Sequence, residues 1–206
     1  NEDLRSIFAA EPCEEMLVRG EQFDVVDNHL ALGGRSIHIS THRAEYLDLF
    51  VPLHGWHQGD NTAVAIAAVE AFFGSALDAE TVQEGLAGVL MPGRFEVVGH
   101  QPLVILDGAH NVDSACKMLE GLKRHFQYSN LVVIFGSSSD KDVRGILREI
   151  STEADCWIMA QAEHSRAMPV GQMTRLMDPH TKEVFEEPSI AQALKKARSL
   201  ATQDDL

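Results

Sequence analysis

The chain has 206 residues, 45% of them apolar, and its 17 lysines and arginines against 31 aspartates and glutamates give a formal net charge of −14. This excess of acid excludes a protein that binds nucleic acid through clustered cations, because neutralising phosphate groups requires lysine and arginine. The longest mainly apolar stretch, residues 63–73, is far shorter than the ~20 residues that cross a bilayer, so no membrane partner is expected.

The first 53 residues are predicted to form a short helix followed by small antiparallel hairpins. The helix is expected at residues 4–10 and the extended runs at 16–19, 23–27, 29–32 and 36–40. Asp27-Asn28 and Gly33-Gly34 tolerate a positive φ and predict the turns between these runs. This part of the chain is interpreted as the trailing edge of a domain.

Two helices are expected next. The alanine-rich run at residues 61–73 is apolar on most faces, which predicts a buried helix that is capped by Asn61 or Thr62 and ended by Gly74. A second helix is expected at 79–90 after an N-cap at Asp78. Met91-Pro92-Gly93 then breaks the pattern, so a domain boundary is predicted that separates residues 1–91 from residues 92–206.

Beyond the boundary, extended and helical segments alternate. Extended runs are expected at residues 95–98, 103–106, 131–135, 156–160 and 182–185, and helices at 112–126, 143–150, 170–177 and 189–200. The runs at 103–106 and 131–135 are continuously apolar, as in strands that are covered on both faces. The alternation predicts a Rossmann-like α/β domain with a mostly parallel sheet, and a further strand is expected to begin at residues 204–206.

In such a sheet ligands bind at the carboxyl ends of the strands, so the loops there are candidate sites. In Asp107-Gly108-Ala109-His110-Asn111, the small residues let the backbone approach a ligand, while Asp107 and His110 supply an acceptor and a donor beside a helix start. A capped turn in which Asn111 starts the helix is an equally weighted alternative.

Two later loops carry charge. In residues 136–142, serines and Lys141 suit an anion, but Asp140 and Asp142 repel one, and helix capping is the favoured interpretation. The group His164, Ser165 and Arg166 offers a histidine and an arginine to a carboxylate, although an ordinary solvated loop also accounts for it.

Upstream, polar amides at residues 55–61 precede a helix and suit recognition of a polar group. His54 and His57 form a weak metal pair with no third ligand, so no metal site is predicted. Arg94 lies in a hinge-like segment where a permanent cation reaches phosphate, the alternative being an ordinary surface arginine. The three cysteines contain no C-x-x-C pair, which favours a reducing, cytoplasmic setting over a disulfide framework.

Four motifs together resemble the folylpolyglutamate synthase and dihydrofolate synthase family of the Mur ligase superfamily. They are His57-Gln58 with Asn61, Met91-Pro92-Gly93-Arg94, Leu106-Asp107-Gly108-Ala109-His110-Asn111, and Phe135-Gly136 followed by Asp140-Lys141-Asp142. The resemblance covers the chain well from about residue 53 to its end, and it covers residues 1–52 loosely, as the closing hairpins of the central ATP-binding domain. It implies that residues 1–91 are the remnant of a central ATP-binding domain and that residues 92–206 are the glutamate ligase domain.

The resemblance further implies a ligase that uses ATP and Mg²⁺ to activate a folate carboxylate as an acyl phosphate. The amine of L-glutamate then displaces phosphate, on dihydropteroate or on tetrahydrofolate and its polyglutamates. Asn61, Arg94 and Asp107 are implied to contact ATP, and His110 to lie at the reaction centre as the catalytic residue. The substrate glutamate is assigned to His164, Ser165 and Arg166.

One departure matters: none of the 206 residues form the glycine-rich G-x-x-G-K-[ST] loop that cradles phosphates, and the magnesium ligands are expected upstream. This chain alone is therefore expected to be inactive. Two alternatives stay open: a stand-alone nucleotide-binding or interaction module with the same fold, and another Mur-type ligase that joins an amino acid to a cell-wall peptide.

Overall fold

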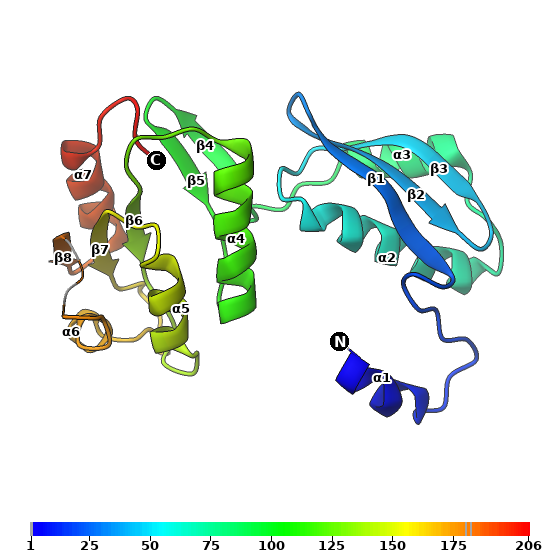
Figure 1. Cartoon of the computed structure of the whole chain (residues 1–206), viewed down its shortest axis with the longest axis horizontal. Coiled ribbons are helices and arrows are strands. Elements are labelled where there is room, and N and C mark those ends of the chain that lie inside the picture. The colour runs from blue at the N-terminus through cyan, green and yellow to red at the C-terminus, as the bar shows by residue number, and fades with distance from the viewer. Residues whose placement is uncertain (1, 180, 182) are drawn as a thin grey trace. The chain divides into compact units, whose positions relative to one another are not determined.

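A computed structural model describes residues 2–179, 181 and 183–206 (Figure 1). The chain divides into two compact units, residues 1–91 and residues 92–206. Each unit is described by itself.

The first unit is a three-stranded antiparallel sheet with two helices packed on it. Its elements are α1 (Glu2–Ala9), β1 (Phe23–Ala31), β2 (Gly34–Thr41), β3 (Glu45–Val51), α2 (His57–Phe73) and α3 (Ala79–Ala87). The strand order is β1-β2-β3, with α2 against β1 and β2 and α3 against β3. Ile37, Ile39 and Tyr46 from the sheet form the core with Ala63 and Ile66 of α2.

The strand predictions for this unit were partly wrong. Asp27-Asn28 is not a turn, because β1 runs through it with a bulge between Val25 and Asp27, whereas the turn at Gly33 is confirmed by its φ of 79°. Residues 16–19 contribute only an isolated bridge from Arg19 to Phe23. The strand β3 was missed, since its alternating pattern is interrupted by Asp48, which has a φ of 52°.

Helix ends in the first unit follow local chemistry only in part. The helix α2 begins at His57, so neither Asn61 nor Thr62 is its cap, and the Thr62 hydroxyl instead donates to the Gln58 carbonyl within the helix. Gly74 ends α2 with a φ of 70°, as predicted. Asp78 caps α3 by accepting a hydrogen bond from the Thr81 amide, also as predicted.

The second unit carries an antiparallel pair and a parallel sheet. The pair is β4 (Glu96–His100) with β5 (Leu103–Leu106), and the parallel sheet has the order β6 (Val132–Phe135), β7 (Cys156–Ala160) and β8 (Glu183–Glu187). The helices are α4 (Val112–His125), α5 (Val143–Ile150), α6 (Val170–Thr174) and α7 (Ile190–Leu200).

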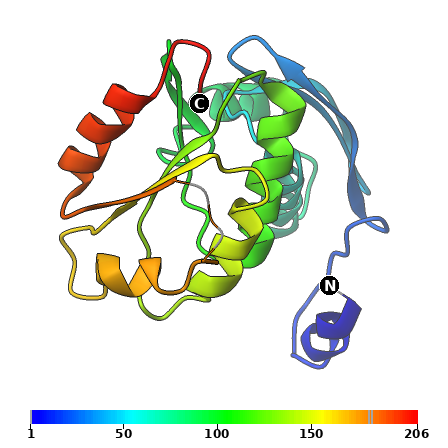
Figure 2. The ribbon, with the colours of Figure 1, turned by 60° about the vertical axis from the view of Figure 1, so that its left-hand side comes forward.

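The central strand β7 is buried along its whole length because helices cover both of its faces (Figure 2). Trp157 and Met159 pack in one cluster with residues of α4, α5 and α6, while Ile158 and Ala160 pack with Ala193 of α7. This alternation is what a strand between two helical layers requires. The predicted α/β fold with a parallel sheet is thereby confirmed.

One expectation for this unit is wrong, and another concerns a residue that the structure does not describe. Residues 103–106 form β5 as predicted, but β5 pairs antiparallel with β4 and Leu106 is 46% exposed, so the strand is not covered on both faces. Lys182, placed in the last predicted strand, lies outside the described residues. In the part of the chain that the structure covers, no helix has both the length and the apolar character needed to cross a membrane.

Candidate functional site

The loop after β5 is held in place by Asp107. Its Oδ2 accepts a hydrogen bond from the Phe95 amide at 2.8 Å and its Oδ1 accepts one from the Ala109 amide at 2.8 Å. The carboxylate therefore fastens this loop to the segment that carries Arg94. Arg94 also lies close by, since a Cβ added to Gly108 would stand 3.6 Å from its Nη1.

His110 projects from the same loop and is exposed. Its Nδ1 lies 2.9 Å from the Gly108 carbonyl oxygen, which can only accept a hydrogen bond, so Nδ1 is the donor. Asn111 caps α4 and forms a reciprocal capping box with Ser114. The capped-turn interpretation is thus confirmed for Asn111.

The segment before β4 is a defined turn. Glu96 accepts a hydrogen bond from the Gly93 amide at 2.7 Å, and both Gly93 and Phe95 have a positive φ, of 69° and 53°. Phe95 tolerates this unfavourable backbone because its ring is buried against Gly121 of α4. Arg94, between them, is exposed.

The loops after β6 and β7 are joined by backbone hydrogen bonds. The Ser139 amide donates to the Arg166 carbonyl at 2.9 Å, and the Met168 amide donates to the Ser137 carbonyl at 2.8 Å. The exposed group His164, Ser165 and Arg166 is therefore brought beside the serine loop. Sequence reasoning treated these two loops separately, because the short ladder between them leaves no local signal.

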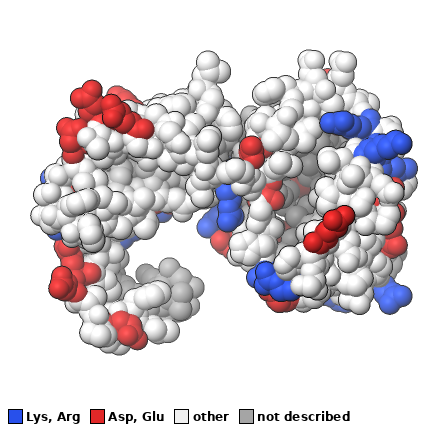
Figure 3. Space-filling view, turned by 180° about the vertical axis from the view of Figure 1, so that it is seen from behind, with Lys and Arg blue, Asp and Glu red and all other residues white. Residues whose placement is uncertain are grey.

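Charges in these loops are partly balanced. Lys141 Nζ lies 3.1 Å from Asp140 Oδ2, and this lysine, with a smaller contribution from Arg166, lowers the pKa of Asp140. Asp142 caps α5 by accepting from the Gly145 amide, so capping by Asp142 is confirmed. Figure 3 shows lysines and arginines in several separate groups rather than in one continuous patch.

In the first unit, Asn61 is exposed in the second turn of α2. Its Nδ2 donates to Gln58 Oε1 at 3.0 Å, and Gln58 Nε2 lies 3.2 Å from His57 Nε2. These three polar side chains form a chain at the helix start. Asn61 lies in a different unit from Arg94 and Asp107.

Two residues that support this helix start were not found from the sequence. Asn28 donates to the Trp56 carbonyl at 2.7 Å, and buried Arg35 donates to the His54 carbonyl at 3.1 Å as well as to Asn28. A Cβ on Gly59 would stand 2.3 Å from Asn28 Nδ2, so glycine is required there for the close approach. Asparagine is common in turns and arginine is usually exposed, so nothing in the sequence indicated that Asn28 and Arg35 support the start of α2.

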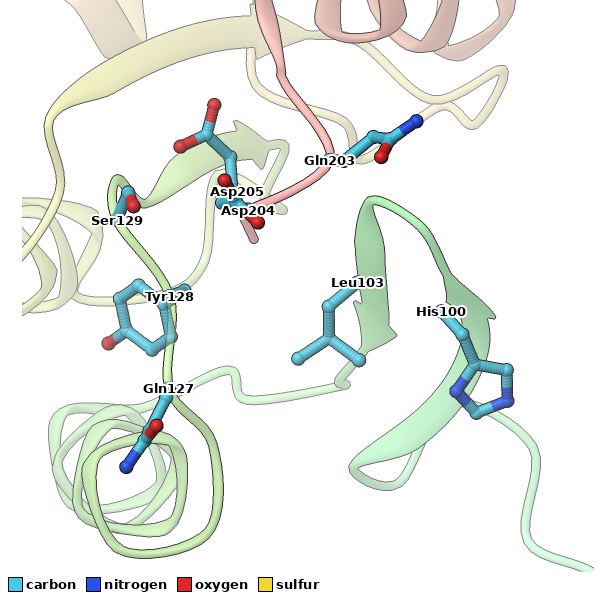
Figure 4. Close-up of a pocket in the computed structure, with 8 residues that line it drawn as sticks. All are labelled: His100, Leu103, Gln127, Tyr128, Ser129, Gln203, Asp204 and Asp205. Carbon is cyan, nitrogen blue, oxygen red and sulfur yellow. The ribbon is translucent and has the colours of Figure 1, made fainter.

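A cavity of about 500 Å³ lies at the opposite edge of the second unit, near the amino ends of β5 and β6 (Figure 4). None of the predicted site residues lines it. Among the described residues, no group of three or more histidines, cysteines, aspartates or glutamates is placed to hold a metal ion.

The fold and loops define a class: an α/β domain in which polar loops follow the carboxyl ends of the parallel strands β6 and β7, where ligands of such domains bind. Comparison with known proteins then gives the family. Residues 93–206 match the family model described as "Mur ligase, glutamate ligase domain", and the chain belongs to this family.

Individual proteins similar to this chain are consistent with that family. The dihydrofolate synthase/folylpolyglutamate synthase of Mycobacterium tuberculosis is 35% identical over 153 residues, which are 72% of this chain and 31% of that protein. The solved structure of M. tuberculosis folylpolyglutamate synthase complexed with ADP and AMPPCP is similar, with a TM-score of 0.84 and 32% identity, over 88% of this chain and 42% of that one.

A second solved structure, a bifunctional folylpolyglutamate synthase/dihydrofolate synthase with Mn, AMPPNP and L-glutamate bound, has a TM-score of 0.72 and 28% identity. The match covers 91% of this chain and 42% of that chain. This chain therefore spans less than half the length of the relatives that it matches.

Proposed function

We propose that this chain is the C-terminal part of an ATP-dependent folate:L-glutamate ligase. In this reaction ATP converts a folate carboxylate, of dihydropteroate or of a tetrahydrofolate polyglutamate, into an acyl phosphate that the amine of L-glutamate attacks. The observation that carries the proposal is the gathering of Arg94, Asp107 and His110 at one edge of a domain of the glutamate ligase family. Similar proteins were solved with ADP, AMPPNP, Mn and L-glutamate.

Arg94 is assigned to the phosphates of ATP. Its guanidinium is exposed, and the cation neutralises charge that develops on a transferred phosphoryl group. Asp107 is a positioning residue in this proposal, because both of its oxygens already accept backbone hydrogen bonds that fix the Arg94–Phe95 segment. Asn61 is assigned to ATP from the first unit.

His110 is assigned to the reaction centre. With Nδ1 donating to the Gly108 carbonyl, Nε2 is assigned to accept a proton from the ammonium group of glutamate. The neutral amine that results attacks the acyl phosphate and displaces phosphate. The anionic substrate suits the joined loops after β6 and β7, where Lys141 and Arg166 supply positive charge beside His164 and Ser165.

The first unit is proposed to be part of a larger ATP-binding domain. The outward side of α2 is apolar and open, since Val64, Val69 and Phe72 are 53%, 41% and 83% exposed. A helix that is apolar all round is normally covered on all sides. Asn61 lies on the same side of this helix, so whatever covers that side approaches the proposed nucleotide contact. The Mg²⁺ ligands are placed in that domain, and a cytoplasmic location completes the proposal.

The test compares this chain with the full-length protein encoded by its gene. We expect the full-length protein to release phosphate from MgATP only when tetrahydrofolate and L-glutamate are both present, and the 206-residue chain alone to release none. Arg94→Ala should lower the full-length kcat by at least 100-fold. Arg124→Ala, which removes another exposed arginine, is the matched control and should stay within twofold. Activity with a muramyl peptide in place of the folate, or ligation by this chain alone, contradicts the proposal.

A further inference from the structure

The helix α2 begins without a cap of its own. Trp56 is its N-cap and makes no side-chain capping bond. A serine, threonine, aspartate or asparagine at that position would satisfy a free amide of the first turn and fix the helix start locally. Here the first turn is held instead by contacts with the sheet. These contacts come from two neighbouring strands, through Asn28 of β1 and Arg35 of β2.

Asn28 ties β1 to the loop before the helix. Its Nδ2 donates to the Trp56 carbonyl at 2.7 Å, and its Oδ1 accepts a hydrogen bond from Arg35 Nε. Arg35 Nη2 also donates to the backbone carbonyl of Asn28 at 3.0 Å. Because a guanidinium only donates and a carbonyl only accepts, the oxygen and nitrogen of the Asn28 amide cannot exchange places. The amide therefore has one orientation, with its nitrogen toward the start of α2.

Arg35 holds the same loop at His54. The arginine is 3% exposed, and its Nη1 donates to the His54 carbonyl at 3.1 Å. The guanidinium is planar, so its three nitrogens reach oxygens of β1 and of the loop in a fixed arrangement. A buried cation is costly unless its hydrogen bonds are made. A shift of the loop would break hydrogen bonds to a buried charge, which fixes the loop against both strands.

Gly59 brings the first turn of α2 against the amide of Asn28. A Cβ built on Gly59 would lie 3.0 Å from Asn28 Cγ and closer still to Nδ2. Close-packed atoms leave no room at that distance, so a larger residue would displace either the amide or the start of the helix. The contact therefore sets how closely the first turn lies to β1. We call Asn28, Arg35 and Gly59 the α2 clamp.

The α2 clamp holds the turn that carries Asn61. Gln58, next to Gly59, is 2% exposed, and its Oε1 accepts a hydrogen bond from Asn61 Nδ2 at 3.0 Å. Because Gln58 is buried, its side chain moves with the backbone of the first turn. Asn61 is exposed and is oriented by Gln58. Displacement of the first turn therefore displaces the Asn61 amide as well.

We propose that Asn28 and Arg35 are positioning residues for nucleotide binding, and that the α2 clamp places Asn61 for its contact with ATP. This inference rests on the proposed function, in which Asn61 contacts ATP. The effect of both residues passes through the first turn of α2. A contact that is ordered before the ligand arrives costs no ordering on binding, so a loosened clamp should lower the affinity for ATP. The kcat at saturating ATP should change little, because the reacting groups are assigned elsewhere.

Calorimetric titration of the full-length protein with MgAMPPNP tests the clamp. Gly59→Ala places a Cβ against the Asn28 amide and should weaken AMPPNP binding at least about fivefold. Gly85→Ala is the matched control, since a Cβ on this glycine of α3 meets nothing within 4 Å, and affinity should stay within about twofold. In the ligase assay, Gly59→Ala should raise the KM for ATP and leave kcat within about twofold.

Asn28→Ala separates the clamp from a general loss of stability. This variant removes the amide and should itself weaken AMPPNP binding at least about threefold. It also leaves room for a Cβ at residue 59, so addition of Gly59→Ala should cause no further loss beyond about twofold. Arg35 is left unchanged, because removal of a buried cation can prevent folding. If Gly59→Ala alone does not fold, the affinity of Asn28→Ala decides.

The outcomes separate the clamp from the ligase. Unchanged affinity in Gly59→Ala and Asn28→Ala, or losses that add in the double variant, overturn the clamp while ligation by the full-length protein still stands. A full-length protein that binds AMPPNP in the expected pattern, but does not join glutamate to tetrahydrofolate, refutes the ligase and leaves the clamp standing. A full-length protein that does not bind AMPPNP refutes both.

Discussion

Removal of the Asp107 carboxylate tests whether this residue positions the candidate site. Asp107→Ala deletes both acceptors and leaves the amides of Phe95 and Ala109 without their partners. Asp107→Asn keeps one oxygen but turns an amide N–H toward the other donor. The two variants therefore separate the loss of one hydrogen bond from the loss of both.

The expected cost follows from the geometry. Each hydrogen bond is 2.8 Å long and charge-assisted, and such a bond contributes roughly 1.5–3 kcal/mol when buried. Because Asp107 is half-buried, we take the lower end of the range and expect a loss of about 2–3 kcal/mol for Asp107→Ala and about 1–2 kcal/mol for Asp107→Asn. For a domain of this size, Asp107→Ala should lower the Tm by roughly 8–12 °C.

Urea unfolding of this chain without nucleotide measures the effect on folding alone. Asp113→Ala is the matched control, because it removes a carboxylate in the next turn that makes an exposed ion pair with Lys117, and it should cost less than about 1 kcal/mol. An Asp107→Ala variant no less stable than Asp113→Ala refutes the positioning role. Asp107 would then have to act through direct contact with a ligand.

Two predictions concern ionisable groups in the cores. Burial and the hydrogen bond to Glu70 raise the pKa of Tyr46 to about 12, so its contribution is complete below pH 10 and is lost as pH rises toward 12. In urea titrations the free energy of unfolding should fall by up to about 3 kcal/mol between pH 10 and 12. Tyr46→Phe should be less stable at pH 8 by about 2–3 kcal/mol, and its free energy of unfolding should depend less on pH over the same range. Hydrogen bonds from the Thr202 amide and the Asn130 side chain lower the pKa of Asp205, so its contribution is present above its ordinary pKa and is lost as pH falls through the folded value. Thermal melts between pH 2 and 6 should show a smaller acid dependence for Asp205→Asn. An unchanged profile contradicts stabilisation of the fold by the hydrogen bonds of this carboxylate.

Sequence reasoning succeeded where a signal is local. The N-caps Asp78, Asn111 and Asp142 each accept a hydrogen bond from an amide three residues ahead, so a short window contains both partners. The continuous apolar run that forms β6 is likewise readable, because a strand between helical layers needs apolar residues on both faces.

It failed where partners are distant in the chain. Asn28 is a residue type that is common in turns, but its side chain hydrogen-bonds the Trp56 carbonyl, 28 residues away. A pattern read over a short stretch of sequence does not contain both partners. The start of α2 was misplaced for a different reason: Trp56, its N-cap, makes no side-chain capping bond, so the sequence carries no capping signal there. Of the candidate site, the loop after β5 was recognisable as a motif, whereas its connection to Phe95 through Asp107 depends on tertiary structure.

The candidate residues lie beside surfaces that the chain leaves open. Asn61 is on the open apolar side of α2, and Asp107 directly follows Leu106 of β5, which is 46% exposed. Covering either surface orders a segment next to a proposed ligand contact, because burial of apolar side chains fixes the backbone that carries them. In each unit, covering these apolar side chains and ordering the neighbouring ligand contact are then coupled events. It follows that ATP should stabilise the full-length protein by an amount that rises with ATP concentration, while leaving the Tm of this chain within about 1 °C.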